Sequence, residues 1–194
     1  HVVRCFEDGN VPHVSDVIDP AADIDTINTE LMISDMEALE RRKTKIEKLA
    51  KSGDKEARSQ MEVLKKLIES INNGRPARAV TELTDEDQRF VKSLTLLSAK
   101  PVLYICNVMD PGDTDKELVQ KVKAIAKEDG SVVVALAGKI EGEIMEMEDP
   151  EEQQMFMEEM GLTETGLDRM IATGYGLLDL STYFTAGEKE TRAW

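Results

Sequence analysis

The chain is poor in aromatic residues, cysteine and long apolar runs. Only 4% of its 194 residues are aromatic. No apolar run approaches the length of about 18 residues that suggests a membrane-spanning helix, and no signal peptide is visible. The two cysteines, Cys5 and Cys106, lie in apolar segments, a pattern that indicates buried free thiols rather than a disulfide framework. We therefore expect a protein of the reducing cytoplasm that does not enter a membrane.

Several sets of residues that support catalysis are also missing. The two histidines, His1 and His13, form no metal-binding pattern with either cysteine, and no Ser-His-Asp or Cys-His arrangement can be argued. The sequence contains no G-x-x-x-x-G-K-[ST] loop, the motif whose backbone cradles nucleotide phosphates. From the residues alone, no catalytic or metal-binding arrangement can be assigned to this chain.

What the sequence does contain is a repeated order of strand, polar motif and helix. Apolar strands are expected at residues 1–6, 102–106 and 132–136, and a helical pattern follows each of the last two. Such units predict an α/β fold with a parallel sheet, and parallel sheets bind ligands where their strands end. A further pair of strands, 182–185 and 191–194, is expected to form a hairpin.

The middle of the chain reads as helical. A helix is expected from Asp23, a candidate cap, to about residue 51, after a loop at 7–22. Asp54 is placed to cap a second helix that ends before Gly74, and Thr84 to cap a third that reaches about residue 97. The first two helices are joined by a tight turn, so we expect an antiparallel, coiled-coil-like hairpin.

Polar motifs end the two strands of the second half. Asn107-Val108-Met109-Asp110 follows the first, and Ala137-Gly138-Lys139 follows the second about 30 residues later. This pair is typical of a site that reads a nucleotide base. Asp110 would accept hydrogen bonds from the base, Val108 would lie against its flat face, and Asn107 would tie the loops together. The alternative is an ordinary strand-to-loop turn at the first motif and a helix-entry turn at the second.

Charge is unevenly distributed. The net charge is −15, yet residues 41–78 carry 12 basic and 5 acidic residues. This segregation indicates a basic helical arm that contacts RNA phosphates, although solvated helix faces are often equally charged. The arm lacks aromatic residues for base stacking. The residues expected to contact a ribosome or RNA are Arg41, Arg42, Lys43, Lys45, Lys48, Lys51, Lys55 and Arg58.

Several stretches resemble the YchF / Obg-like ATPase family, a branch of the translation-factor-class P-loop NTPases. The most specific are Ile27-Asn28-Thr29-Glu30-Leu31 and residues 182–190 with 192–194, and matches run in a consistent order from residue 1 to residue 194. The resemblance implies a P-loop NTPase-type sheet, of which only the back half is present, at 1–22 and 97–180. A helical coiled-coil insertion would occupy 23–96, and a β-rich TGS domain would begin at 181–194. The phosphate loop, both switches and the Mg²⁺ ligands would precede His1, so we expect a fragment.

The resemblance also implies a function. It implies a cytoplasmic protein that binds and hydrolyses ATP or GTP with Mg²⁺ and associates with the ribosome, on its large subunit, with RNA as a further partner. The family motif is generally N-x-x-E, whereas Asp110 stands at its last position here. Val108, rather than the usual GTPase lysine, follows the family, so we expect ATP to be preferred. We expect the chain alone to bind nucleotide weakly and not to hydrolyse it.

Two alternatives remain open at this point. In the first alternative, the protein is a ribosome- or RNA-docking module that binds through its basic helical hairpin, and nucleotide only regulates this binding. A purely structural coiled-coil scaffold is the weaker alternative, because it leaves the two strand-end motifs unexplained.

Overall fold

A computed structural model describes residues 1–11 and 17–193. Part of the expected loop at 7–22 and the end of the expected hairpin, Trp194, lie outside the described residues. The chain divides into two compact units, His1–Pro20 with Val102–Trp194 (unit 1) and Ala21–Pro101 (unit 2).

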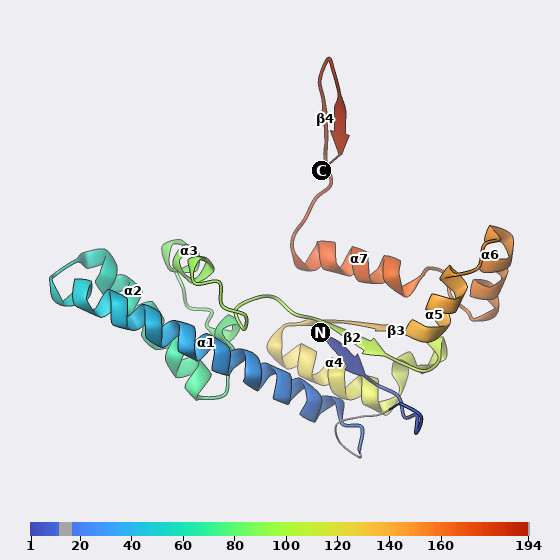
Figure 1. Cartoon of the computed structure of the whole chain (residues 1–194), viewed down its shortest axis with the longest axis horizontal. Helices are drawn as coiled ribbons and strands as arrows, with labels where there is room; N and C mark the ends of the chain where they lie inside the picture. The colour runs from blue at the N-terminus through green and yellow to red at the C-terminus, as the bar shows by residue number, and fades with distance from the viewer. Residues whose placement is uncertain (12–16, 194) are drawn as a thin grey trace. The chain divides into compact units, whose positions relative to one another are not determined.

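Unit 1 is built on a parallel sheet, which confirms the expected α/β fold class. Strands β1 (Val2–Arg4), β2 (Leu103–Asn107) and β3 (Val132–Leu136) pair in that order, with β2 in the middle (Figure 1). Helix α4 (Glu117–Asp129) connects β2 to β3 and contacts both strands. Val119 and Val122 form the buried face of α4. In the same unit, Tyr104 and Cys106 of β2 are fully buried. The apolar runs that predicted these strands therefore reflect a covered sheet.

Polar side chains cap three of the four remaining helical elements in the described part of unit 1, all except the one that directly follows β3. The elements after β2 and β3 are η2 (Pro111–Asp115), α5 (Gly138–Met145), α6 (Pro150–Glu159) and α7 (Gly166–Leu177). Asp149 caps α6 and Thr165 caps α7 through side-chain oxygens that accept backbone N–H groups. Strands β4 (Phe184–Ala186) and β5 (Thr191–Ala193) pair antiparallel, so a hairpin forms here as expected.

Unit 2 is helical. Helix α1 (Pro20–Lys51) and helix α2 (Lys55–Asn72) bury Leu39, Leu64 and Leu67 in one apolar core. Asp54 caps α2 as expected, its side chain accepting the N–H of Ala57 at 2.9 Å. The start of α1 was predicted too late: the helix begins at Pro20, a residue pre-organised for a first helical position, and Asp23 lies in the first turn instead of capping it.

The short elements after α2 are η1 (Ala77–Ala79) and α3 (Asp85–Ser93). Thr84 and Asp87 form a reciprocal capping box at the start of α3, so the cap was predicted correctly. The end was predicted too far along the chain. Thr95 adopts a left-handed backbone conformation, with φ of 53°, which is incompatible with a helix that continues to residue 97.

A buried carboxylate joins distant parts of unit 2. Asp35 of α1 is 3% exposed and accepts the backbone N–H groups of Leu97 at 2.8 Å and Ser98 at 2.7 Å. The hydroxyl oxygen of Ser98 in turn accepts the N–H of Ala77 at 3.1 Å. Asp35 thus anchors the segment after α3 to α1, and through Ser98 it also fixes η1.

We expect Asp35→Ala to lower the free energy of unfolding by about 1–3 kcal/mol, because two N–H groups lose their acceptor while still buried. Urea unfolding followed by helical circular dichroism measures the effect. Glu30→Ala, on the exposed side of the same helix, is the control and should change stability by at most about 0.5 kcal/mol. Equal stability of the two variants would show that Asp35 does not anchor the segment.

Candidate functional site

The ends of β2 and β3 bring the two polar motifs together. The strands are in register, with Asn107 opposite Leu136. Directly beyond them, the N–H of Val108 donates to the carbonyl of Leu136 at 2.9 Å, and the N–H of Gly138 donates to Asn107 Oδ1 at 3.1 Å. Asn107 therefore ties the two loops, as its role in a base site would require.

The close approach leaves little room for a side chain at position 138. A Cβ atom there would stand 3.1 Å from Asn107 Oδ1 and 3.5 Å from a methyl carbon of Leu136. Ala137 is buried, whereas Gly138 and Lys139 are exposed at the start of α5. The second loop thus offers the Lys139 side chain to a ligand from a fixed backbone.

The first motif exposes different side chains from those expected. Val108 is 3% exposed, so its side chain belongs to the core and offers almost no surface to a base. Met109, at 40%, is the exposed apolar residue of the motif. Asp110 is also exposed, and its Oδ1 accepts the N–H of Gly112 at 2.8 Å, which caps η2. Burial thus speaks against the expectation that Val108 covers a base, and Met109 is the apolar side chain of the motif left exposed.

A hollow of about 660 Å³ lies beside this motif. We call it the strand-end hollow; its lining residues are Cys5, Phe6, Glu7, Met109, Asp110, Asp113, Lys116, Glu117 and Leu118. Apart from Met109 and Asp110, sequence analysis did not assign these residues to a site. The missed signal was β1, whose carboxyl end lies at the same sheet edge as that of β2, so that residues after β1 also reach the site.

Charge in the strand-end hollow is mostly negative. Four of its lining residues are acidic and one, Lys116, is basic. Lys116 Nζ lies 2.8 Å from Asp113 Oδ2, so its charge is partly neutralised. A phosphate group is repelled by such a lining, whereas the N–H groups of a base find acceptors there.

Phe6 and Cys5 form the part of the hollow contributed by the segment after β1. The guanidinium carbon of Arg4 lies 4.7 Å from the centroid of the Phe6 ring, and Arg4 also donates to the carbonyls of Phe6, Asp8 and Val11. The hydrogen bond of Cys5 with Cys106, together with burial, raises the pKa of the Cys5 thiol. The hollow therefore holds a positioned aromatic ring beside an un-ionised thiol.

The expected RNA-contacting residues lie on the helices of unit 2. Residues 41–51 of this set belong to α1, and Lys55 and Arg58 belong to α2. Arg41 pairs with Glu37 at 3.6 Å, Lys43 with Glu40 at 3.2 Å and Lys51 with Glu47 at 2.7 Å. These partners are exposed, and exposed pairs of this kind are worth little, so the cations remain available to another anion.

Three of these cations surround a second hollow of about 420 Å³. We call it the hairpin hollow; its lining residues are Ala38, Leu39, Arg41, Arg42, Lys45, Ser93, Leu94 and Leu96, none of which is acidic. Arg42 also stacks over the ring of Phe90, with its guanidinium carbon 5.7 Å from the centroid. A hollow with an apolar floor and a cationic edge attracts anions.

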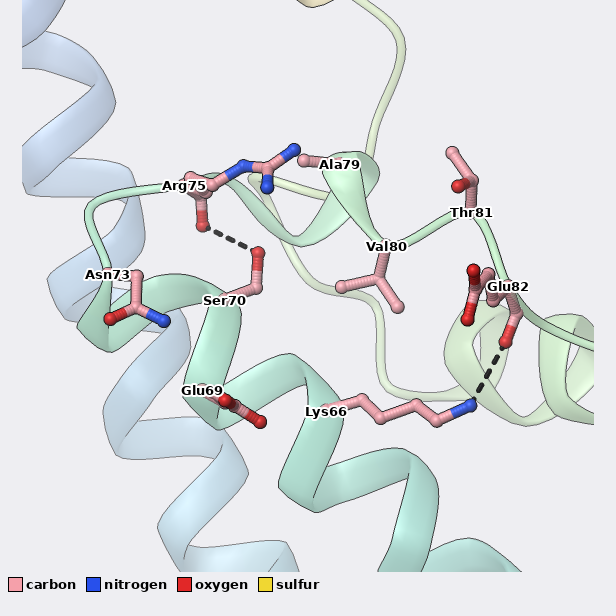
Figure 2. Close-up of a pocket in the computed structure, with 9 residues that line it drawn as sticks. All are labelled: Lys66, Glu69, Ser70, Asn73, Arg75, Ala79, Val80, Thr81 and Glu82. Carbon is pink, nitrogen blue, oxygen red and sulfur yellow. Dashed lines mark hydrogen bonds between the residues drawn. The ribbon is translucent and has the colours of Figure 1, made fainter.

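Figure 2 shows a third hollow, also about 420 Å³, where α2 ends. Lys66 Nζ donates to the carbonyl of Glu82 at 3.1 Å, and the Ser70 hydroxyl donates to the carbonyl of Arg75 at 3.1 Å (Figure 2). Its four charged residues are two cations and two carboxylates, so the lining carries no net charge. The hydrogen bonds link α2 to the segment that follows it.

Comparisons with known proteins extend over the whole chain. No family model matches it. The chain is 49% identical over 197 residues to the ribosome-binding ATPase YchF of Bacillus subtilis and 45% identical over 194 residues to that of Escherichia coli O157:H7. Each match covers 100% of this chain and 53% of the relative. The chain belongs to the YchF family. It spans about half the length of the curated YchF relatives it matches.

The solved structure of the Schizosaccharomyces pombe YchF GTPase has the same fold as this chain. The TM-score is 0.82 at 27% sequence identity, and the match covers 100% of this chain and 53% of that YchF chain. In the described part of this YchF-family chain, every helix is too short or too polar to cross a membrane.

We expect Asn107→Ala to release the second loop. The Gly138 amide should exchange with solvent about five times faster, because a hydrogen bond worth about 1 kcal/mol is lost. Hydrogen exchange followed by NMR on the 194-residue chain measures this rate. The Val108 amide, bound to a backbone carbonyl, serves as the internal control, and an unchanged Gly138 rate would contradict the tie.

Proposed function

We propose that this chain supplies the base-recognition part of a cytoplasmic, ribosome-associated P-loop NTPase that binds and hydrolyses ATP, with GTP as a second substrate. The observation that carries the proposal is the hydrogen-bonded joining of the Asn107–Asp110 and Ala137–Lys139 loops. They lie beside a hollow whose carboxylates can accept hydrogen bonds from a base. The names of the YchF relatives, ribosome-binding ATPase and GTPase, support the activity and the partner.

The proposal assigns a role to each part of the chain. Residues 1–22 and 97–180 form the back half of the nucleotide domain, 23–96 a helical insertion and 181–194 the start of a TGS domain. The phosphates and Mg²⁺ are held by residues that precede His1 in the longer polypeptide. Because phosphoryl transfer depends on positioning and on the metal's charge, this chain contributes selectivity rather than the chemical step.

In the proposed site the base enters the strand-end hollow. Phe6 and Met109 supply apolar surface for its faces, and Asp110 accepts hydrogen bonds from its edge. Asp110 Oδ1 already accepts the N–H of Gly112, which leaves Oδ2 as the freer oxygen. Guanine presents two N–H donors side by side and needs both oxygens, whereas the amino group of adenine needs one. The Gly112 hydrogen bond therefore weakens a guanine contact more than an adenine contact, although Oδ1 keeps a second lone pair.

The test is a competitive titration of fluorescent ATP and GTP analogues against the natural full-length polypeptide. We expect ATP to bind more tightly, and the 194-residue chain alone to bind either nucleotide weakly and not to hydrolyse it. Tighter binding of GTP would mean that both oxygens of Asp110 read guanine. If neither nucleotide binds, or if the chain alone turns over ATP, the proposal fails.

In the same titration, a substitution in the lining tests whether the strand-end hollow itself contacts the base. Phe6→Ala should weaken both nucleotides about tenfold, since stacking of a base on an aromatic ring is worth about 1–3 kcal/mol. Phe156→Ala removes a partly exposed ring on α6 that does not line the hollow, and it should leave both affinities unchanged.

A second candidate function is docking on ribosomal RNA through the basic face of α1 and α2. The cations around the hairpin hollow favour it, because no lining residue opposes a phosphate there and the neighbouring ion pairs are exposed. In this alternative the helices bind the ribosome, on its large subunit, and nucleotide only regulates the contact.

Charge reversal at Arg41, Arg42 and Lys43 tests this second function. We expect the triple glutamate variant to lose ribosome co-sedimentation at least tenfold in physiological salt, while nucleotide affinity stays within about twofold. Reversal of Lys121, Lys123 and Lys127, three lysines of α4 that do not line the strand-end hollow, controls for net charge. Undiminished co-sedimentation of the first variant would exclude docking by these helices.

A further inference from the structure

Glu141 is a buried carboxylate to which neither motif of the base site assigns a role. It lies in the first half of α5 and is 8% exposed. Its Oε1 accepts the N–H of Ala137 at 3.1 Å, and its Oε2 accepts the N–H of Gly166. One side chain therefore holds the first residue of the Ala137–Lys139 loop and the first residue of α7.

The surroundings of Glu141 explain how it stays buried. Ala137 precedes α5 and offers no side-chain cap, and Gly166 begins α7, so the carboxylate faces the positive ends of two helices. Arg169 Nη2 lies 3.7 Å from Oε1 and adds a partly buried positive charge. Together these contacts hold the carboxylate in one fixed orientation.

Space at position 166 is limited by the same carboxylate. A Cβ atom on Gly166 would stand 2.6 Å from Glu141 Oε2 and 2.6 Å from the Cβ of Leu136, the residue that ends β3. The start of α7, the carboxylate and the strand end are thus packed without room for a methyl group. A displacement of α7 therefore acts on Glu141 directly.

We propose that Glu141 is a positioning residue for base recognition, which fixes the Ala137–Lys139 loop against Asn107 and couples it to α7 through Gly166 and Arg169. The inference rests on the proposed function, because it concerns the same base site. Glu141 touches no part of the nucleotide. It holds Ala137, whose neighbour Gly138 donates to Asn107 Oδ1, so its loss shifts the second loop relative to the first.

The test compares affinities for ATP and for inorganic tripolyphosphate, which has the phosphates without the base, in the natural full-length polypeptide. The ratio of the two dissociation constants is the gain due to base and sugar. We expect Glu141→Gln to reduce this gain about tenfold, since an amide cannot accept both N–H groups, and to leave tripolyphosphate affinity unchanged. Glu143→Gln, on the exposed side of α5, should change neither.

Arg169→Gln provides a milder variant should Glu141→Gln fail to fold. Arg169 is partly exposed and only flanks the carboxylate, so we expect a decrease of about threefold in the gain. In the 194-residue chain, Glu141→Gln should also speed hydrogen exchange of the Gly138 amide, a readout that needs no nucleotide.

The outcomes separate this inference from the proposed function. If Glu141→Gln lowers only the melting temperature and leaves both the gain and the Gly138 exchange rate unchanged, Glu141 is structural and the inference is wrong. If the unaltered protein binds ATP no better than tripolyphosphate, the proposed base site itself is wrong, and the role of Glu141 in it falls as well.

Discussion

Parallel pairing of β2 with β3 is the constraint on which the candidate site depends. The register places Asn107 opposite Leu136, so both strands end at the same edge and their following residues meet. Beyond the strand ends, a side-chain hydrogen bond takes the place of the backbone hydrogen bonds of the sheet. Asn107 Oδ1 accepts the N–H of Gly138, which lies 31 positions along the chain. A Cβ atom at position 138 would stand only 3.1 Å from that oxygen, so glycine favours this approach. Sheet geometry, one amide side chain and one glycine thus define the relation between two loops that the sequence separates by an entire helix.

Buried carboxylates have a similar role in both units. Asp35 accepts two backbone N–H groups in unit 2, and Glu141 accepts two in unit 1. A buried carboxylate costs free energy unless hydrogen bonds or opposite charges replace its lost hydration. Both side chains meet that condition by joining segments distant in sequence, over 62 positions for Asp35 and Leu97 and 25 for Glu141 and Gly166. An apolar side chain could fill the same volume but could not hold these N–H groups in place.

Local signals predicted much of the fold. The strand at 132–136 and the caps at Asp54 and Thr84 depend on neighbouring residues, and they were found where expected. Features that depend on tertiary packing were missed. The sequence predicted that Val108 covers a base, but in the folded chain its side chain is buried. Phe6 lines the strand-end hollow because β1 pairs beside β2, and no pattern within residues 1–6 predicts this pairing. Likewise, the sequence does not distinguish Glu141 from its many acidic neighbours. Its distinct position comes from the contact with Gly166 at the start of α7.

The division of the proposed nucleotide site between segments has an energetic consequence. Neutral hydrogen bonds contribute about 0.5–1.5 kcal/mol each, whereas association costs about 4–15 kcal/mol in translational and rotational freedom. Contacts to a base alone therefore hold a nucleotide weakly. Once phosphates are bound by another part of the polypeptide, that cost has already been met, and the base contacts act at their full strength. In that arrangement the placement of Asp110 and of the Ala137–Lys139 loop governs both how much the base adds to affinity and which base is preferred. A rigid tie such as Glu141, which holds Ala137 in place, then acts on the base contacts without itself touching the base.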